Sequence, residues 1–281
     1  MPKTVFITGC SSGFGRASVI RFLGGGWNVV ATMRDPAKWD GGQIGDRLMI
    51  LPLDVPKAES IDAAFSAAIE RFGKIDAVVN NAGKGLFSVF EVTPQETVQD
   101  VFETNFFGPL KVMRAAIPRM RLSGGGTVVN IASGSAIVAE PLMATYSASK
   151  AALDSFTEAL TGELADQAIR LKIVIPGFVP GTNFLERTRA AAEAIPVPKA
   201  YEDYVNARLA SYTSASPVAF ATDEEVAEVI FSAAGDARDQ LRWLVGPDMA
   251  EASHLWWETS EAEYAAWRRS HFGIARRPFR S

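Results

Sequence analysis

The stretch Val5-Phe6-Ile7-Thr8-Gly9-Cys10-Ser11-Ser12-Gly13-Phe14-Gly15 decides the fold of this chain. A short apolar run predicts a buried strand, and the residues after Gly15 follow a helical period. Gly9 permits a tight turn, Gly13 lets the backbone approach a pyrophosphate, and Gly15 lets the helix pack closely on the strand. The free amides and the dipole of a helix N-terminus attract an anion. We therefore expect a nucleotide-binding turn, with a purely structural turn as the alternative.

Short apolar runs rich in β-branched residues alternate with longer segments of helical period. Runs that are apolar throughout are typical of parallel strands covered on both faces. Strand–helix–strand alternation predicts right-handed crossovers. We expect an α/β fold: a Rossmann-type, doubly wound parallel sheet of about seven strands with helices on both faces. The expected strands are 5–7, 28–32, 48–53, 77–80, 127–131, 171–175 and 241–245, and the expected helices are 15–23, 61–72, 94–120, 144–164 and 224–234.

Two regions fall outside this alternation. Residues 183–218 carry Phe184 and three tyrosines, and a connection of this length predicts a lid over the substrate. Residues 248–281 hold three of the six tryptophans, so we expect a packed C-terminal extension. Its basic run at 276–280 is interpreted as a solvated end, with a membrane-surface role as the alternative. No linker or repeat interrupts the chain, and we expect one dinucleotide-binding and catalytic domain over residues 1–281.

The composition limits the classes of protein to consider. A chain of 281 residues with 48% hydrophobic and 21% charged side chains is not disordered. The net charge of -4 argues against a nucleic-acid partner. The single cysteine, Cys10, cannot form an internal disulfide, so we expect a reducing compartment, the cytoplasm. The N-terminus is too briefly apolar for a signal peptide, and polar residues interrupt the longest uncharged stretch, 123–139, so we expect no membrane span.

Further motifs follow the glycine-rich turn, each at the end of an expected strand or within a helix that follows one. They are Asn80-Asn81-Ala82-Gly83, Asn105, Ser133, Tyr146-Ser147-Ala148-Ser149-Lys150, Pro176-Gly177 and Thr182. Together with the Thr-Gly-x-x-x-Gly-x-Gly spacing of residues 8–15, this order resembles the classical short-chain dehydrogenase/reductase family up to about residue 250. The extended branch of that family spaces its glycines as Gly-x-x-Gly-x-x-Gly, which this chain does not.

Tyr146 and Lys150 are four residues apart and share one helix face. A tyrosine pKa near ~10 is too high for efficient proton exchange at neutral pH. A lysine cation favours the phenolate, and so does the positive nicotinamide of an oxidised cofactor. The resemblance implies carbonyl–alcohol interconversion, in which hydride attacks carbon, Tyr146 supplies the proton and Ser133 holds the oxygen. It also implies that Asn105 holds a water that relays protons to Lys150; a helix cap or kink is the alternative for Asn105.

The second expected strand ends without the acid that NAD-preferring proteins use to bind the ribose hydroxyls. Arg34 follows and can make a forked contact with a 2′-phosphate, so we expect NADP(H) rather than NAD(H). Asp35 keeps NAD(H) possible, and an Arg34–Asp35 ion pair is the ligand-free alternative. Asn80 is expected to brace the sheet. The expected cofactor-binding residues, of which those from Asp54 onward rest on the resemblance, are Gly9, Ser11, Ser12, Gly13, Phe14, Gly15, Arg34, Asp54, Val55, Asn81, Ala82, Gly83, Tyr146, Lys150, Pro176, Gly177, Val179 and Thr182.

The expected substrate pocket lies over the candidate catalytic residues, and its walls are mostly apolar or aromatic. Such a pocket favours a hydrophobic ketone, aldehyde or alcohol over a sugar phosphate. The chain also resembles the steroid- and retinoid-type members of the family, which is an analogy at the level of the fold. The expected substrate-binding residues are Ser133, Ile137, Val138, Met143, Tyr146 and Phe178, together with the segment 183–218.

Two other functions remain open. One is a non-catalytic redox-sensing regulator that binds NADP, and the other is a scaffold or membrane-surface protein built on an inactive dehydrogenase. The two histidines, His254 and His271, have no cysteine or carboxylate partners at metal-ligand spacing, so we expect no metal. Many members of the family are dimers or tetramers packed through their long helices, and the resemblance therefore implies a homo-oligomer.

Overall fold

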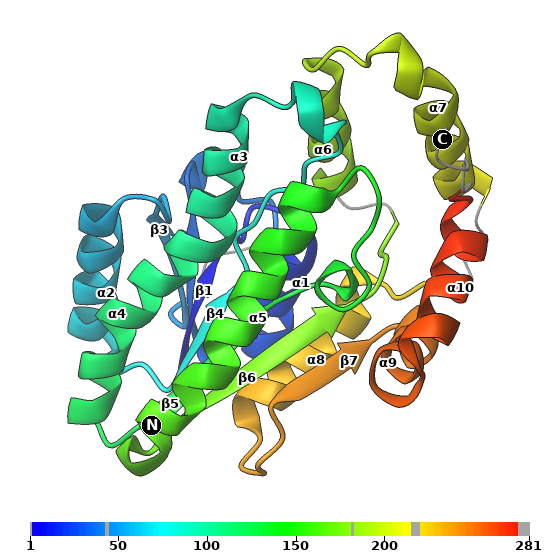
Figure 1. Ribbon diagram of the computed structural model, residues 1–281. Helices are drawn as coiled ribbons and strands as arrows, with labels where there is room; N and C mark the ends of the chain where they lie inside the picture. Colours follow the sequence, from blue (N-terminus) through cyan, green and yellow to red (C-terminus); the bar gives the residue numbers. More distant parts are fainter. Residues whose placement is uncertain (1, 43–44, 181–182, 215–219, 275–281) are drawn as a thin grey trace.

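The computed structural model describes residues 2–42, 45–180, 183–214 and 220–274. Seven parallel strands form one sheet in the order β3-β2-β1-β4-β5-β6-β7 (Figure 1). The order reverses between β1 and β4, which confirms the predicted doubly wound, Rossmann-type sheet. The strands are β1 Thr4–Thr8, β2 Asn28–Met33, β3 Leu48–Pro52, β4 Ala77–Asn80, β5 Gly126–Ile131, β6 Ile169–Pro176 and β7 Arg242–Val245.

Helices flank the sheet and extend beyond its edge. The expected helix 94–120 is not continuous, because a π-helical turn over Glu103–Phe107 separates α3 from α4. Two helices occupy the segment 183–218 and two more form the C-terminal extension. Among the described helices, none combines the length and apolar character needed to cross a membrane. The α-helices are α1 Gly13–Gly24, α2 Ala58–Phe72, α3 Gln95–Phe102, α4 Gly108–Leu122, α5 Ala144–Leu164, α6 Asn183–Glu193, α7 Glu202–Ser214, α8 Asp223–Gly235, α9 Asp248–Glu258 and α10 Glu261–Phe272.

Alternate strand residues point to opposite faces of the sheet and build two cores. Val5 and Ile7 of β1 pack in the layer that contains α1 and α8. Phe6, between them, faces the layer of α2, α4 and α5, and its ring stacks on Phe65 at a centroid distance of 4.3 Å. Each fully buried side chain of this kind contributes about 1.5–3 kcal/mol. The apolar strands of the sequence are therefore explained by burial on both faces.

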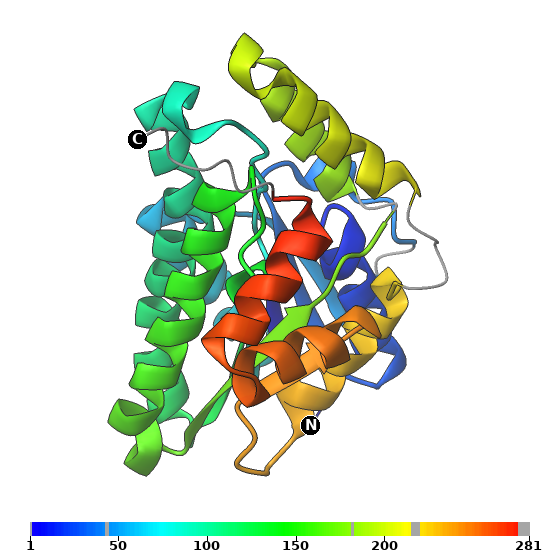
Figure 2. The same ribbon diagram turned by 45° about the vertical axis from the view of Figure 1, so that its right-hand side comes forward.

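The C-terminal helices cover a third apolar cluster. Met249 of α9 and Tyr264 and Phe272 of α10 pack with Ile173 and Ile175 of β6. Figure 2 shows α9 and α10, in orange and red, lying across the end of the sheet that carries β6 and β7. The extension therefore packs on the fold through these residues, with Trp267 beside them, whereas Trp256 and Trp257 are half-exposed.

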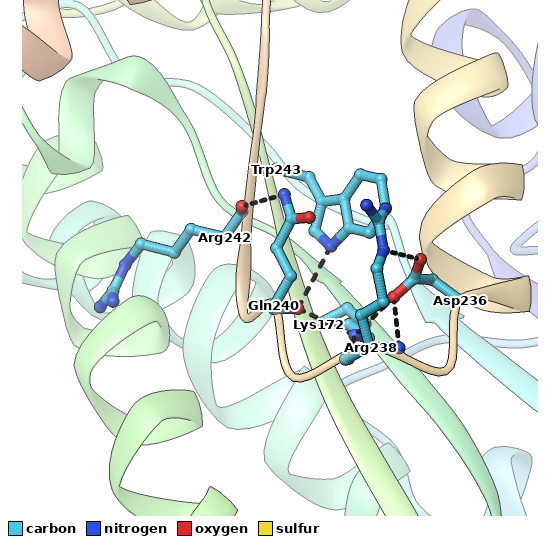
Figure 3. Close-up of polar contacts among 6 residues, drawn as sticks. All are labelled: Lys172, Asp236, Arg238, Gln240, Arg242 and Trp243. Carbon is cyan, nitrogen blue, oxygen red and sulfur yellow. Dashed lines mark hydrogen bonds and ion pairs between the residues drawn. The ribbon is translucent and has the colours of Figure 1, made fainter.

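A buried lysine fixes the turn that leads into β7. Lys172 of β6 donates hydrogen bonds to the backbone carbonyls of Arg238, at 2.6 Å, and Gln240, at 2.8 Å, and its ammonium lies 3.4 Å from the Asp236 carboxylate (Figure 3). The ring of Trp243 lies beside the same ammonium. Because a buried charge is costly unless paired, these contacts fix the path of the turn.

Candidate active site

The glycine-rich turn joins β1 to α1 at the point where the strand order reverses. Gly9 has a φ of 74°, and a Cβ there would lie 2.8 Å from the Cα of Ala82. A Cβ on Gly15 would lie 2.3 Å from the carbonyl oxygen of Gly9. Side chains are therefore excluded at both positions, as the sequence pattern predicts. Ser12 is the N-cap residue of α1, so the first free amides of that helix lie at the turn.

The residues after β4 hold this turn in place. Asn81 donates its side-chain amide to the carbonyls of Thr8, at 2.9 Å, and Gly9, at 3.1 Å. The Thr8 hydroxyl accepts from the backbone amides of Asn81 and Ala82, both at 3.0 Å. The Asn81 amide nitrogen thus supports the turn, and the expected cofactor contact of Asn81 stays a prediction. Asn80 donates to the Asn130 side chain at 2.8 Å and braces the sheet as expected.

Ser133, Tyr146 and Lys150 come together beyond the ends of β5 and β4. Ser133 follows β5, and its hydroxyl is hydrogen-bonded to the phenol of Tyr146 in α5. Lys150 lies one turn further along α5 and donates to the carbonyl of Ile131 at 2.8 Å. Both α5 side chains are buried. The expected catalytic trio therefore lies in one place, beside the glycine-rich turn.

The electrostatics of this trio differ from the expectation. Burial raises the pKa of Tyr146 to about 12; the Ser133 hydrogen bond acts in the opposite direction and nearby Glu140 adds to the rise. Burial also lowers the pKa of Lys150 to about 8. Among the protein's own groups, the loss of solvation therefore outweighs the Ser133 hydrogen bond. Tyr146 is a protonated acid at neutral pH.

Asn105 lies in the π-helical turn and is fully buried. Its side-chain oxygen accepts from the amide of Lys84 at 2.9 Å, and its amide donates to the Lys84 carbonyl and the Ser149 hydroxyl. A Cβ on Gly83 would lie 3.3 Å from this oxygen and 3.5 Å from the Lys150 ammonium. Asn105 and Lys150 therefore flank Gly83, and Asn105 ties the segment after β4 to α5. The helix is interrupted at Asn105 by the π-helical turn, and the water-holding role that the resemblance implies for Asn105 stays a prediction.

A small cavity lies beside the glycine-rich turn at the end of β2. It has a volume of about 50 Å³ and is lined by Ser11, Arg34, Asp35, Lys38 and Arg187. The Asp35 carboxylate accepts from the backbone amide of Ala37 at 3.1 Å and caps the short helical turn that follows. Among the described residues, no ion pair joins Arg34 to Asp35, so the ligand-free alternative for Arg34 is not realised.

Lys38 and Arg187 were not expected at this place. Lys38 follows Arg34 by four residues in the connection after β2, and this closeness in sequence could have suggested it. Arg187 lies on α6, in a segment without a clear pattern. A larger cavity, of about 250 Å³, lies on the other side of the turn. Its lining includes Asp40, Asp223 and Glu224, and these acids make it a poor place for a phosphate.

The expected substrate walls are only partly where the sequence suggests. Ile137 and Val138 are buried under the C-terminal helices, in the cluster that contains Met249, Tyr264 and Phe272. The extension thus covers residues that were expected to face the substrate. Met143 is buried directly before α5. Phe178 packs edge-on against Phe220 with ring centroids 4.9 Å apart.

An aromatic residue of α6 lies against the candidate acid instead. The ring of Phe184 is 5.5 Å from that of Tyr146. A Cβ on Gly85 would lie 2.2 Å from the hydroxyl of Thr188, so α6 also packs closely on the segment after β4. The sequence names Phe184 in the expected lid, but its place against Tyr146 is seen only in the structure.

The remaining expected cofactor residues lie at the carboxyl ends of the strands or directly beyond them. Gly177 follows β6 and donates its amide to Val245 at 2.9 Å. Thr182 lies outside the described residues. No group of three or more His, Cys, Asp or Glu side chains suited to a metal ion occurs in the described part of the chain. The others are Gly13 and Phe14 in the first turn of α1, Asp54 and Val55 after β3, Pro176 at the end of β6, and Val179, buried in the α1–α8 layer.

Comparison with known proteins decides the family. The model of the short chain dehydrogenase family matches residues 3–193, more than half of the chain. The protein belongs to the short-chain dehydrogenase family. This short-chain dehydrogenase is 32% identical to an uncharacterized oxidoreductase of Schizosaccharomyces pombe, over 82% of its own chain and 94% of that protein. It is also 32% identical to retinol dehydrogenase 8 of Bos taurus, over 86% of its own chain and 80% of that protein.

Solved structures resemble the dehydrogenase over most of its length. A short-chain dehydrogenase from Streptomyces avermitilis has a TM-score of 0.79 and 31% identity, covering 97% of this chain and 99% of its own. An enzyme from Burkholderia phymatum in complex with NAD has a TM-score of 0.75 and 26% identity, covering 90% and 92%. One from Burkholderia cenocepacia in complex with NADP has a TM-score of 0.72 and 25% identity, covering 98% of each chain.

Proposed function

We propose that this short-chain dehydrogenase is an NADP(H)-dependent oxidoreductase that interconverts a hydrophobic ketone or aldehyde and the corresponding alcohol. The proposal rests on one observation. The Ser133 hydroxyl is hydrogen-bonded to the buried Tyr146 phenol, one helical turn from Lys150 and beside the glycine-rich turn. This set supplies a proton, a hydrogen bond to oxygen and a positive charge at one place.

A bound nicotinamide cofactor supplies hydride to the carbonyl carbon, or accepts it from the alcohol carbon. Tyr146 donates its phenolic proton to the carbonyl oxygen in reduction and takes that proton back in oxidation. Ser133 holds the same oxygen by a hydrogen bond. The Lys150 ammonium stabilises the phenolate that forms, because an opposite charge offsets the cost of burying it. Asn105 orders the segment that lies between the glycine-rich turn and α5. Protons are exchanged with solvent at this segment.

Three features of the chain fit a nicotinamide dinucleotide. Gly9 and Gly15 leave no side chain over the turn, and the N-terminus of α1 offers free amides to a pyrophosphate. The cavity at the end of β2 brings Ser11 and Arg34 together with two further cations. Its single carboxylate, Asp35, already has a backbone partner. The charge balance supports a 2′-phosphate, and therefore NADP(H), although solved relatives hold either NAD or NADP.

The surroundings of Tyr146 support an apolar substrate. Phe184 of α6 contacts its ring and gives the site an aromatic wall. Apolar walls with a few convergent polar groups are typical of sites for hydrophobic small molecules. The relative named retinol dehydrogenase 8 is consistent with this class, since retinol is an apolar alcohol.

The experiment that tests the proposal measures NADPH consumption with a panel of hydrophobic ketones and aldehydes. We expect Tyr146→Phe to lower turnover by about 10²–10⁴-fold, the range of general acid catalysis, with NADPH affinity nearly unchanged. Tyr201→Phe is the matched control, because Tyr201 bonds Glu91 at the surface and should turn over like the wild type.

Each contrary result removes one part of the proposal. Substantial turnover by Tyr146→Phe would contradict the role of Tyr146 as the acid. Equal kcat/KM for NADH and NADPH would remove the cofactor preference. Binding of NADPH without turnover of any carbonyl compound would favour the redox-sensing regulator.

We further propose a homo-oligomer, a dimer or tetramer, in the cytoplasm. Phe107, in the π-helical turn directly before α4, is half-exposed and contacts Phe106, so it offers an apolar side chain to a second copy beside the long helices. Sedimentation equilibrium measures the oligomeric state directly.

A further inference from the structure

Three cations converge on the cavity at the end of β2, and they come from two distant segments. Arg34 and Lys38 follow β2, whereas Arg187 lies on α6, about 150 residues later in the chain. Their side chains make no hydrogen bond or ion pair with any residue that the structure describes. Other arginines nearby are paired: Arg16 with Asp40 at 2.9 Å, and Arg189 with Glu193 at 3.3 Å.

Like charges that share a cavity repel one another unless an anion lies between them. The volume, about 50 Å³, exceeds the ~10–15 Å³ that a single water needs. The Ser11 hydroxyl adds a neutral donor at the same place. The lining therefore suits a compact anion with several acceptor oxygens, such as a phosphate monoester.

The face of α6 that carries Arg187 also reaches the candidate acid. Phe184, Arg187 and Thr188 are three and four residues apart and share one side of the helix. Phe184 lies against Tyr146, and Thr188 is buried over Gly85. One helix thus contacts the cavity at the end of β2 and the catalytic residues, whereas Arg189 points into solvent with 81% of its side chain exposed.

We infer that Arg187 is a specificity-determining residue that binds the cofactor 2′-phosphate together with Arg34 and Lys38, and that this contact holds α6 against Tyr146. A cofactor that carries the 2′-phosphate then orders α6 on the substrate side of the site, as well as the cavity that holds the phosphate. A cofactor without it leaves α6 without this contact. The inference rests on the proposed NADP(H) preference and adds to it a second chain segment that selects the phosphate.

Calorimetric binding of adenosine 2′,5′-bisphosphate and of adenosine 5′-monophosphate tests the inference without catalysis. We expect Arg187→Met to weaken the bisphosphate about 5- to 10-fold and to leave the monophosphate unchanged. Arg189→Met, on the same helix, should bind both ligands like the wild type. Arg34→Met should also weaken the bisphosphate, since it tests the cofactor preference itself.

Hydrogen exchange of the backbone amides of 183–193 gives the second readout. The bisphosphate should slow exchange there in the wild type and in Arg189→Met, but not in Arg187→Met. Wild-type bisphosphate affinity in Arg187→Met, together with a loss in Arg34→Met, would overturn the inference and leave the NADP(H) proposal standing. Equal affinity of the wild type for both nucleotides would overturn the preference, and the inference with it. Weakened binding without any change in exchange would overturn the coupling to α6.

Discussion

The Lys150 ammonium is buried, and its burial has a measurable effect on the free energy of unfolding. Its pKa is lowered to about 8, whereas an unfolded chain returns it to ~10.4. Between these values the unfolded chain binds more protons, so the contribution of Lys150 to the free energy of unfolding rises as pH rises. We expect the stability of the wild type, measured relative to Lys150→Met, to increase by about 2–3 kcal/mol from pH 7 to pH 10.

Urea unfolding at several pH values measures this difference. The matched control is Lys74→Met, because Lys74 pairs with Asp76 at 2.6 Å but is half-exposed. Its difference from the wild type should stay nearly constant over the same range. Parallel pH dependences for the wild type and Lys150→Met would contradict the buried charge.

The positions of the proposed catalytic residues could be predicted from the sequence because local spacing places them on defined elements. Tyr146 and Lys150 share a helix face wherever α5 lies, and Ser133 is fixed by the end of β5. Phe184 was expected only as part of the lid, and the place of Arg187 could not be predicted, since both depend on how α6 packs across Gly85 and Tyr146. The support that the Asn81 side chain gives to the glycine-rich turn could not be predicted either, because its partners, the carbonyls of Thr8 and Gly9, belong to a distant segment.

At the scale of elements, the apolar pattern predicts every strand of the sheet to within two residues at either end. It fails within 94–120, where a continuous helix was expected although Asn105 and the Gly108-Pro109 pair are poor helix formers. There the interruption comes from tertiary contacts, because buried Asn105 bonds Lys84 and Ser149 and the backbone adapts as a π-helical turn. The helices α6, α7, α9 and α10 also escaped prediction, since they lie outside the strand–helix alternation that identified the rest.

The turn between α8 and β7 offers a test of how one buried charge fixes an element. In Lys172→Met, the carbonyls of Arg238 and Gln240 and the Asp236 carboxylate lose their ammonium donor (Figure 3). Removing one partner of a buried charged group costs about 3–5 kcal/mol, because the others stay desolvated. We expect a loss at the lower end of this range, since Asp236 keeps its hydrogen bond to Arg238.

Urea unfolding of Lys172→Met at neutral pH gives the value, and Lys74→Met again serves as the exposed control, with a loss below about 1 kcal/mol. NADPH binding should not change, because β7 lies at the far edge of the sheet from the glycine-rich turn. A loss equal to that of the control would mean that water replaces Lys172 as the donor in this turn.

At the scale of the whole molecule, the segment 183–218 and the C-terminal extension meet beside the expected substrate pocket. The guanidinium of Arg208, in α7, lies 5.1 Å from the ring of Phe272, in α10. The same ring belongs to the apolar cluster that contains Ile137 and Val138. The C-terminal extension therefore supports both the loop after Ser133 and the helices above the site, on the side away from the glycine-rich turn.

This arrangement predicts a selective effect of Phe272→Ala. Truncating a buried phenylalanine costs about 3–5 kcal/mol, and here the loss falls on the packing of α10 against the loop that follows Ser133. We expect KM for the carbonyl substrate to rise several-fold while NADPH affinity, measured by titration, stays unchanged, because none of the cofactor-turn contacts involves α10. Phe90→Ala is the control, since Phe90 is 71% exposed and its loss should alter neither quantity. If NADPH affinity falls together with substrate affinity, the extension stabilises the whole sheet and not the substrate side alone; if neither falls, Ile137 and Val138 keep their places without it.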